Sequence, residues 1–117
     1  MILYHIASQA DWARARAEGE YTADSLETQG FIHCSTRAQV LDVANALFRG
    51  RSDLVLLLID ERRLRAPVRY ENLEGGARLF PHLYGPLNLD AVVRALPFQP
   101  DSEGGFRLPE EASGQLL

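Results

Sequence analysis

A run of six aliphatic residues, Leu54 to Ile59, is the feature that most constrains the fold of this 117-residue chain. The run has the length of a β-strand and falls far short of a membrane span. Because no polar residue interrupts it, we expect a central strand that is covered on both faces. A chain of this length supports one hydrophobic core, so we expect a single domain organised around this strand.

Two helices are expected before the aliphatic run. Ser8 caps a helix that continues to about Glu18. Thr36 and Gln39 have the residue types and the spacing of a capping box, which opens a second helix over residues 37–48. The apolar residues of this second helix recur at helical spacing and are expected to be buried: Val40, Val43, Ala44, Leu47 and Phe48.

Extended segments surround these helices. Helices fall early and strands late, so the order is not a repeating strand–helix–strand unit, and we predict an α+β fold with a mostly antiparallel sheet. Residues 1–109 are expected to form the single domain and residues 110–117 a flexible tail. The predicted strands are residues 2–7, 31–35, 54–60, 68–72 and 91–98, with a short partner strand at 106–108, whereas 20–29 and 79–87 are predicted to be irregular.

Composition narrows the functional classes. The net charge is −4 and the isoelectric point about 5.3, which argues against binding to nucleic-acid backbones. All 12 basic residues are arginines, which leaves a small anionic ligand open. The single cysteine and the lack of a signal-peptide core or a membrane span in the sequence predict a cytoplasmic protein without membrane contact.

The stretch from Gly30 to Thr36 is where the sequence predicts a site, because a strand leads there into a helix. It holds an imidazole, the only thiol and two hydroxyls in seven positions. Side chains alternate across a strand, so His33 shares a face with Ser35, and Cys34 points to the core. A buried cysteine behaves as a small hydrophobic residue. We therefore expect one wall of a binding pocket here, and no thiol nucleophile.

The three histidines are candidates for a shared cleft. His5 lies on the first strand and His33 on the second, both on the face opposite the better core face, and His82 lies in an irregular segment. Imidazole titrates near neutral pH, so His82 is the candidate acid–base group. Three imidazoles would suit zinc, but none of their spacings is that of recognised metal ligands, and we expect no metal.

Five other residues are candidates because of their chemistry. Glu71 suits a general base or a ribose contact, and its alternative is an exposed strand carboxylate. Ser35 and Thr36 lie at a helix start, where hydroxyls and amides receive anions, and Thr36 is also the expected cap. Tyr21 and Tyr84 suit stacking on a planar ring or simple packing.

Several segments together match a known pattern: Tyr4-His5-Ile6, Trp12, Gly30-Phe31-Ile32-His33-Cys34-Ser35, Gln39-Val40, Ala44-Asn45 and Phe80-Pro81-His82-Leu83-Tyr84-Gly85-Pro86-Leu87. They resemble the small bacterial proteins grouped as domain of unknown function 952 (DUF952). The resemblance extends from about residue 3 to residue 109. This family has no established activity that could be transferred to the chain.

The resemblance implies a divergent, minimal ADP-ribosyltransferase-like fold, in which a split antiparallel sheet with two helices in its N-terminal half holds NAD. It implies that His5 contacts a ribose and that His33 stands where transferases place a ring against nicotinamide. Transferases also carry a glutamate on a late strand, and residues 91–98 contain no carboxylate. Either Glu71 or His82 takes that role, or the protein binds without transfer.

Two functional hypotheses follow from the resemblance and the residues together. In the first, the protein is an enzyme acting on NAD or an ADP-ribose-like nucleotide, with His33, His82 and Glu71 as catalytic residues. The second hypothesis is a non-catalytic module that binds a nucleotide or metabolite in the same cleft. A zinc- or cysteine-dependent hydrolase is a third alternative. The residues expected to contact the nucleotide are His5, Ser35, Thr36, Tyr21 and Tyr84.

Overall fold

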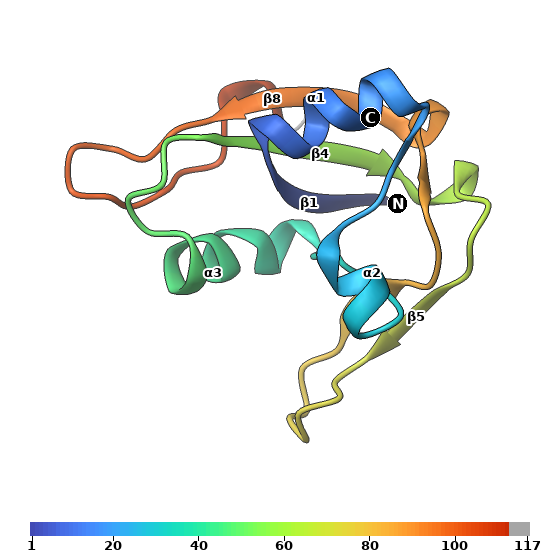
Figure 1. The fold of residues 1–117 in the computed structure, drawn as a ribbon. Helices are drawn as coiled ribbons and strands as arrows, with labels where there is room; N and C mark the ends of the chain where they lie inside the picture. The colour runs from blue at the N-terminus through green and yellow to red at the C-terminus, as the bar shows by residue number, and fades with distance from the viewer. Residues whose placement is uncertain (113–117) are drawn as a thin grey trace.

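Residues 1–112, which are those described by the computed structural model, form an α+β fold with three small antiparallel sheets (Figure 1). The strand orders are β1-β4-β8, β3-β6-β5 and β2-β7. None of the helices in these residues is long and apolar enough to cross a lipid bilayer. In chain order the elements are β1 (Ile2–Ser8), α1 (Gln9–Glu18), β2 (Glu20–Tyr21), α2 (Asp24–Thr28), β3 (Ile32–His33), α3 (Arg37–Leu47), β4 (Leu54–Asp60), the 3-10 helix η1 (Glu61–Arg63), β5 (Val68–Glu71), β6 (Phe80–Leu83), β7 (Leu87–Asn88), η2 (Leu89–Ala91), β8 (Val92–Phe98) and η3 (Glu110–Ala112).

β4 lies at the centre of its sheet, which confirms the prediction from its aliphatic sequence. It pairs antiparallel with β1 on one edge and with β8 on the other. Its side chains alternate between two cores: Leu57 and Ile59 pack on the side of α1, whereas Leu56 and Leu58 pack on the side of α3. The two helices cover opposite faces of the sheet (Figure 1). Because burying one such side chain contributes about 1.5–3 kcal/mol, β4 anchors both cores.

The predicted starts of the two long helices and the predicted end of the first are confirmed, and the second helix ends one residue early, at Leu47. Ser8 is the N-cap of α1, where its Oγ accepts a hydrogen bond from the Asp11 N–H at 3.0 Å. Gly19 ends this helix with a φ of 94°, in the left-handed region that glycine adopts without strain. The capping box of α3 is present, and the Gln39 side chain accepts from the Thr36 backbone N–H at 3.0 Å.

The apolar stripe of α3 is buried only in part. Val40 and Ala44 are fully buried against the sheet, as predicted. Leu47 is 72% exposed, so its expected burial was wrong, and Val43 and Phe48 are buried only in part. The helix rests on the sheet along a narrower strip than its apolar face, and the remaining apolar residues face a cleft described below.

Three segments differ from their predicted structure. Residues 20–29 contain β2 and the short helix α2, and residues 79–87 contain β6 and the start of β7, so neither segment is irregular. Elements of two to five residues are too short for a period to be visible in sequence. Residues 106–108 form no strand; instead the Phe106 ring stacks on Phe98 with centroids 4.8 Å apart.

The beginning of the predicted tail is part of the fold. Residues 110–112 form η3, and Ala112 is buried with the α3-side core. The rest of the predicted tail, residues 113–117, lies outside the described residues.

A single backbone bridge joins β1 to the segment that follows β3. The Tyr4 N–H donates to the Ser35 carbonyl, and the Ser35 N–H donates to the Tyr4 carbonyl, each at 2.8 Å. This bridge is isolated and does not extend into a ladder between the two strands. The backbones of the two three-stranded sheets are therefore paired at this one place, and the cleft described below opens beside it.

His5 was predicted to point to the less apolar face of β1, but that face is the more deeply buried of the two. Leu3 and Ala7 on that face are buried, whereas Ile2 and Ile6 on the other are half-buried. The reason is that β1 is covered on both faces, so alternation along its sequence could not show which face is buried more deeply.

Gly85, between β6 and β7, should not tolerate a side chain. A Cβ atom at this position would lie 2.6 Å from the Ala66 Cβ, closer than two carbon atoms can pack. We expect Gly85→Ala to lower the free energy of unfolding by about 1–3 kcal/mol, measured by urea denaturation. Gly105→Ala is the control, because its nearest contact would be an ordinary 3.5 Å, and its effect should stay within about 0.5 kcal/mol. Equal effects of the two substitutions would contradict the close approach.

Candidate functional site

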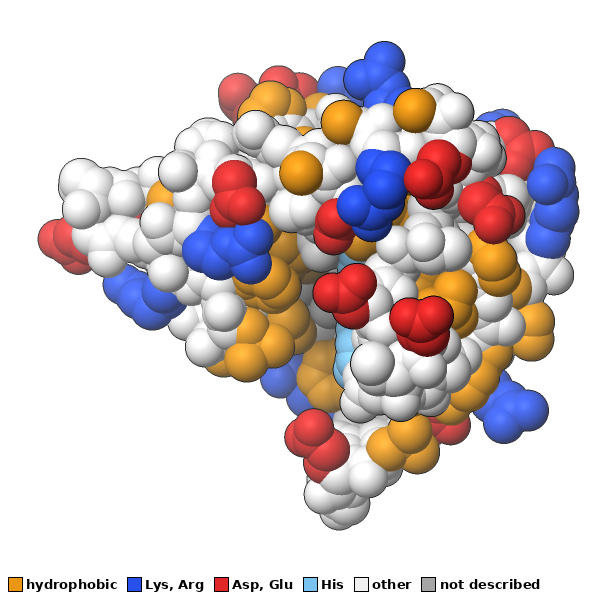
Figure 2. All heavy atoms as spheres, in the orientation of Figure 1, with side chains coloured by type: hydrophobic (Ala, Val, Ile, Leu, Met, Phe, Trp, Pro, Cys, Tyr) orange, Lys and Arg blue, Asp and Glu red, His pale blue; other side chains and the backbone are white. Residues whose placement is uncertain are grey.

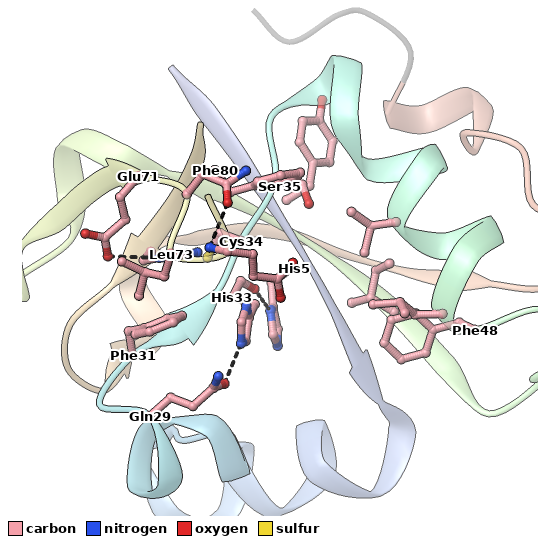
Figure 3. A pocket seen from close by; sticks show the side chains of 17 residues that line it. His5, Gln29, Phe31, His33, Cys34, Ser35, Phe48, Glu71, Leu73 and Phe80 are labelled. Carbon is pink, nitrogen blue, oxygen red and sulfur yellow. Dashed lines mark hydrogen bonds and ion pairs between the residues drawn. The ribbon is translucent and has the colours of Figure 1, made fainter. Parts of the chain in front are cut away.

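A cleft of about 510 Å³ opens between β1, α3 and the β3-β6-β5 sheet. In Figure 2 it is a groove with histidine at its base and apolar side chains along one wall. Its volume is in the range of small-molecule sites. Figure 3 shows how residues from segments far apart in sequence converge here. Among the predicted site residues, five line the cleft: His5, His33, Ser35, Glu71 and His82.

His82 and Glu71 form a hydrogen-bonded pair on neighbouring strands. The His82 Nδ1 lies 2.9 Å from the Glu71 Oε2, and the Tyr84 hydroxyl donates to the same oxygen. These bonds lower the pKa of Glu71 from its usual value, and the bond from Tyr84 has a larger effect than the bond from His82. A carboxylate can only accept, so the His82 Nδ1–H donates to it, and in the neutral form of the ring the Nε2 carries the lone pair.

The Nε2 atom of His82 is open to the cleft. It makes no hydrogen bond within residues 1–112, although only 6% of His82 is exposed. Every fully buried side-chain nitrogen and oxygen in these residues has a partner, so the Nε2 is reached by solvent. The ring itself is held by stacking on Phe31, with centroids 4.0 Å apart and planes at 15°. His82 thus presents a fixed, unpartnered acceptor to anything in the cleft.

His33 stands next to this pair. Its ring meets the His82 ring edge to face with centroids 5.4 Å apart, and its Nε2 lies 2.7 Å from the Gln29 Oε1. The pKa of His33 is lowered, mainly by its partial burial and to a lesser extent by the proximity of His82. The ring is exposed to the cleft, and at neutral pH it is a neutral hydrogen-bonding group.

His5 is fully engaged with neighbouring groups. Its Nδ1 lies 2.5 Å from the His33 carbonyl oxygen and donates to it, and its Nε2 accepts from the Tyr21 hydroxyl at 2.8 Å. Burial lowers the pKa of His5 from 6.5 to about 4, so the ring is neutral at pH 7. Both nitrogens are used, and His5 ties β1 to β3 and β2 while forming part of the cleft wall.

Of the other candidates, Ser35 lines the cleft, and the remaining three lie outside the lining. Ser35 lines the cleft beside its bridge to Tyr4. Thr36 is the N-cap of α3, and it is not among the lining residues. Tyr21 and Tyr84 are also outside the lining, where their hydroxyls hold His5 and Glu71.

Cys34 is buried, as predicted from strand alternation. It is 4% exposed, and burial raises the pKa of its thiol to about 12. A thiol in this state is not a nucleophile at neutral pH.

Sequence reasoning missed the apolar wall of the cleft. The signal for it was an apolar stripe on α3 that is wider than the strip needed to cover the sheet. Gln29, at the C-cap of α2, was also missed because the segment gave no visible pattern. The apolar residues of this wall are Val43, Leu47, Phe48, Leu73 and Phe80.

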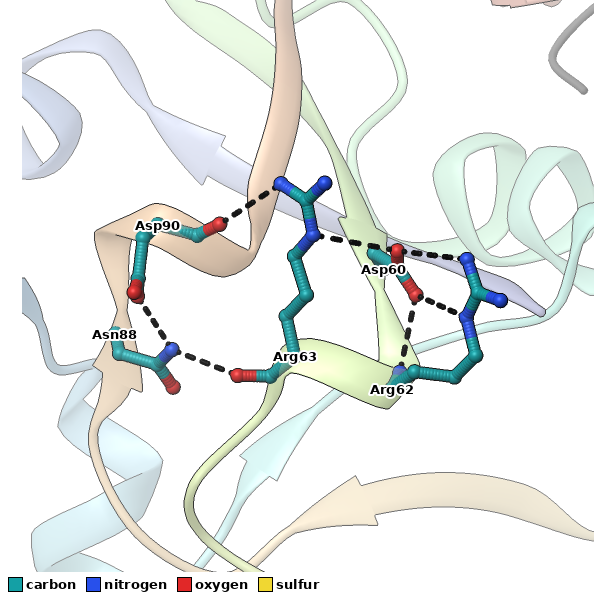
Figure 4. A network of polar contacts seen from close by, with 5 residues as sticks. All are labelled: Asp60, Arg62, Arg63, Asn88 and Asp90. Atoms are coloured by element: carbon teal, nitrogen blue, oxygen red, sulfur yellow. Dashed lines mark hydrogen bonds and ion pairs between the residues drawn. The ribbon is translucent and has the colours of Figure 1, made fainter.

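A second polar network lies outside the cleft and fastens a corner of the fold (Figure 4). The Asp60 carboxylate accepts from the Arg62 backbone N–H at 3.0 Å and forms ion pairs with Arg62 and Arg63. The Asn88 amide donates to the Arg63 carbonyl and to the Asp90 carboxylate. These bonds link η1 to η2, which is a structural role. Within residues 1–112, no three His, Cys, Asp or Glu are grouped to hold a metal ion.

This fold and this cleft define a small α+β protein with a histidine-lined site of ligand size. The sequence profile of the family described as "Protein of unknown function (DUF952)" matches residues 6–95, and the chain belongs to this family. The crystal structure of protein CC0527 from Caulobacter crescentus is similar, with 35% identity, coverage of 92% of this chain and 95% of that chain, and a TM-score of 0.83. The solution NMR structure of CC0527 gives 35% identity, 96% and 97% coverage and a TM-score of 0.82. A comparison with curated proteins gave no match.

Stability should depend on pH through His5. Its pKa is about 4 in the folded protein and about 6.5 in an unfolded chain, so the unfolded state binds more protons between these values. The contribution is complete above pH 6.5 and is lost as the pH falls toward 4. We expect the free energy of unfolding to fall by about 3 kcal/mol over this window, measured by urea denaturation at several pH values.

Two variants test whether His5 causes this pH dependence of stability. His5→Asn should flatten the slope between pH 6.5 and 4, whereas His33→Asn, at an exposed ring, should keep most of it. Carboxylates with a lowered pKa, such as Glu71, begin to add their own loss below about pH 4.5, at the lower end of this window. An unchanged slope in His5→Asn would show that the buried imidazole is not the source.

Cys34 should resist thiol reagents in the folded protein. Because its thiol is buried and protonated, labelling by Ellman's reagent at pH 7–8 should be limited by unfolding and become rapid in urea. Measuring the colour change with and without urea tests this. Rapid labelling of the native protein would revive a thiol mechanism.

Proposed function

We propose that the protein is an enzyme that uses His82 as a general acid–base group on a small molecule, and that this molecule is NAD or a related ADP-ribose-containing nucleotide. The observation that carries the proposal is the Glu71–His82 pair at the cleft wall. A carboxylate that accepts from one imidazole nitrogen orients the other nitrogen and stabilises the imidazolium when that nitrogen takes a proton.

The wall around His82 supports a catalytic role for this residue. Phe31 holds the ring by stacking, and Tyr84 holds the carboxylate partner, so the pair is restrained before a ligand arrives. His33 lies within reach of the same space and offers a second, neutral imidazole. A proton acceptor that is fixed in place needs little reorganisation during the reaction.

The nucleotide assignment rests on the resemblance to ADP-ribosyltransferase-like proteins and on the chemistry of the cleft. Aromatic and carboxylate side chains together suit the positively charged nicotinamide ring. The late-strand glutamate of transferases is absent, and β8 contributes no residue to the cleft lining. Glu71 on β5 and Glu74 in the following loop are the carboxylates in reach.

Hydrolysis of NAD in this cleft would break the bond between ribose C1′ and the ring nitrogen. The electron pair of this bond stays on the nitrogen, so that neutral nicotinamide leaves. A water oxygen bonds to C1′ and loses its proton to the His82 Nε2. The Glu71 carboxylate stabilises the imidazolium that forms, and the negative charge of Glu74 favours the positive charge that develops at C1′.

Nicotinamide release tests the proposal. We expect the protein to release nicotinamide from NAD, followed by liquid chromatography, and we expect His82→Ala to slow release about 100-fold or more. Tyr84→Phe should slow it less, because Glu71 keeps its bond to His82. Tyr70→Phe is the matched control: its hydroxyl also donates to a glutamate, Glu61, but lies outside the cleft lining.

The same preparation separates the alternatives. Thermal stabilisation by NAD without release would identify a non-catalytic binding module; a ligand at 100 times its Kd adds about 2.7 kcal/mol. Neither stabilisation nor release with NAD or ADP-ribose would reject the nucleotide. Release that survives in His82→Ala would reject the acid–base role.

A further inference from the structure

We propose that the cleft holds small organic cations that carry an aromatic or apolar group in preference to anions of the same size, so that of NAD it would hold the cationic nicotinamide end and leave the diphosphate outside the lining. The inference concerns the charge of what the cleft holds, uses the site of the proposed function, and requires no turnover. It rests on the distribution of charge and aromatic surface around the cleft.

Apart from the three histidines, the cleft-lining side chains that are charged at neutral pH are acidic. Glu71 and Glu74 line the cleft, and none of the 12 arginines does; the chain has no lysine. Glu71 remains ionised because Tyr84 and His82 donate to its carboxylate. An anion such as a phosphate would therefore enter a space that offers carboxylates and no basic side chain.

Two of the three histidines add little positive charge to the cleft. The His5 Nδ1–H donates a hydrogen bond to the His33 carbonyl, and its Nε2 accepts one from the Tyr21 hydroxyl, which keeps the ring neutral. His33 lies beside His82, and a positive charge on either ring would disfavour one on the other.

Two arginines beside the lining, Arg78 and Arg69, already rest on aromatic rings. The Arg78 guanidinium lies 3.0 Å from the Asp42 carboxylate and 5.5 Å from the centre of the Phe80 ring. Arg69 lies 4.9 Å from the centre of the Tyr84 ring, which is outside the lining. On the opposite rim, acidic side chains stand over α2 next to the groove in Figure 2.

The walls provide surfaces on which an organic cation would rest. Phe31, Phe48 and Phe80 line the cleft, and the Arg78 guanidinium on Phe80 shows that a ring here already receives a cation. Leu47 and Leu73 also line the cleft and are 72% and 63% exposed, so apolar surface remains uncovered. A cation over an aromatic face is favoured, and low-dielectric walls strengthen its attraction to carboxylates.

Three one-ring probes that differ in charge test the inference: benzylammonium, benzyl alcohol and benzoate. Their dissociation constants are measured at pH 7 by NMR titration of the histidine ring signals. We expect benzylammonium to bind about tenfold more tightly than benzyl alcohol, and benzoate to bind most weakly. Benzoate binding as tightly as benzylammonium would overturn the inference, as would the absence of binding by all three.

Paired variants locate the selectivity. Glu74→Gln removes one exposed cleft carboxylate and should reduce the preference for benzylammonium about threefold. Glu18→Gln, at the exposed end of α1 and outside the lining, should leave it unchanged. An equal loss in both variants would show that the preference comes from the net charge of the protein and not from the cleft, and it would overturn the inference. Binding of benzylammonium without nicotinamide release would reject the enzyme and keep the cation site. Nicotinamide release by a protein that binds the three probes without charge preference would reject the cation site and keep the enzyme.

Discussion

The bridge between Tyr4 and Ser35 is the contact on which the site depends. It fastens the β1-β4-β8 sheet to the β3-β6-β5 sheet at one pair of residues, and the His5 bond to the His33 carbonyl adds a second tie beside it. Because the ladder stops there, β1 and β3 do not close into one continuous sheet. The cleft is the space that α3 and the β5–β6 hairpin enclose next to this incomplete junction.

The polar groups of this region fall into two sets with different consequences. His5 and Tyr21 satisfy one another and the backbone, so they stabilise the junction and have little capacity left for a ligand. Glu71, which is itself held by Tyr84, satisfies only one side of His82 and leaves its Nε2 toward the cleft. Two histidines that look alike in sequence thus have opposite roles, because one has both nitrogens engaged and the other has one free.

Much of the fold could be predicted from sequence. β4 and the helices α1 and α3 carry strong local signals: an unbroken aliphatic run, two N-terminal caps and a helical apolar period. The elements that were missed, β2, α2, β6 and β7, span two to five residues, and long-range pairing places them. The assignment to DUF952 was also visible in the sequence, through motifs that together cover most of the chain.

The sequence by itself determined that His33 and Ser35 share a face, that Cys34 turns inward and that a helix begins at Arg37, because alternation and capping are local properties of the backbone. Only the tertiary structure decided that His82 meets Glu71 and His33, because these contacts depend on the register of β6 between β3 and β5. It also decided which part of the apolar face of α3 is core and which is cleft. That division depends on where the two sheets separate, a distance between elements that no local pattern encodes.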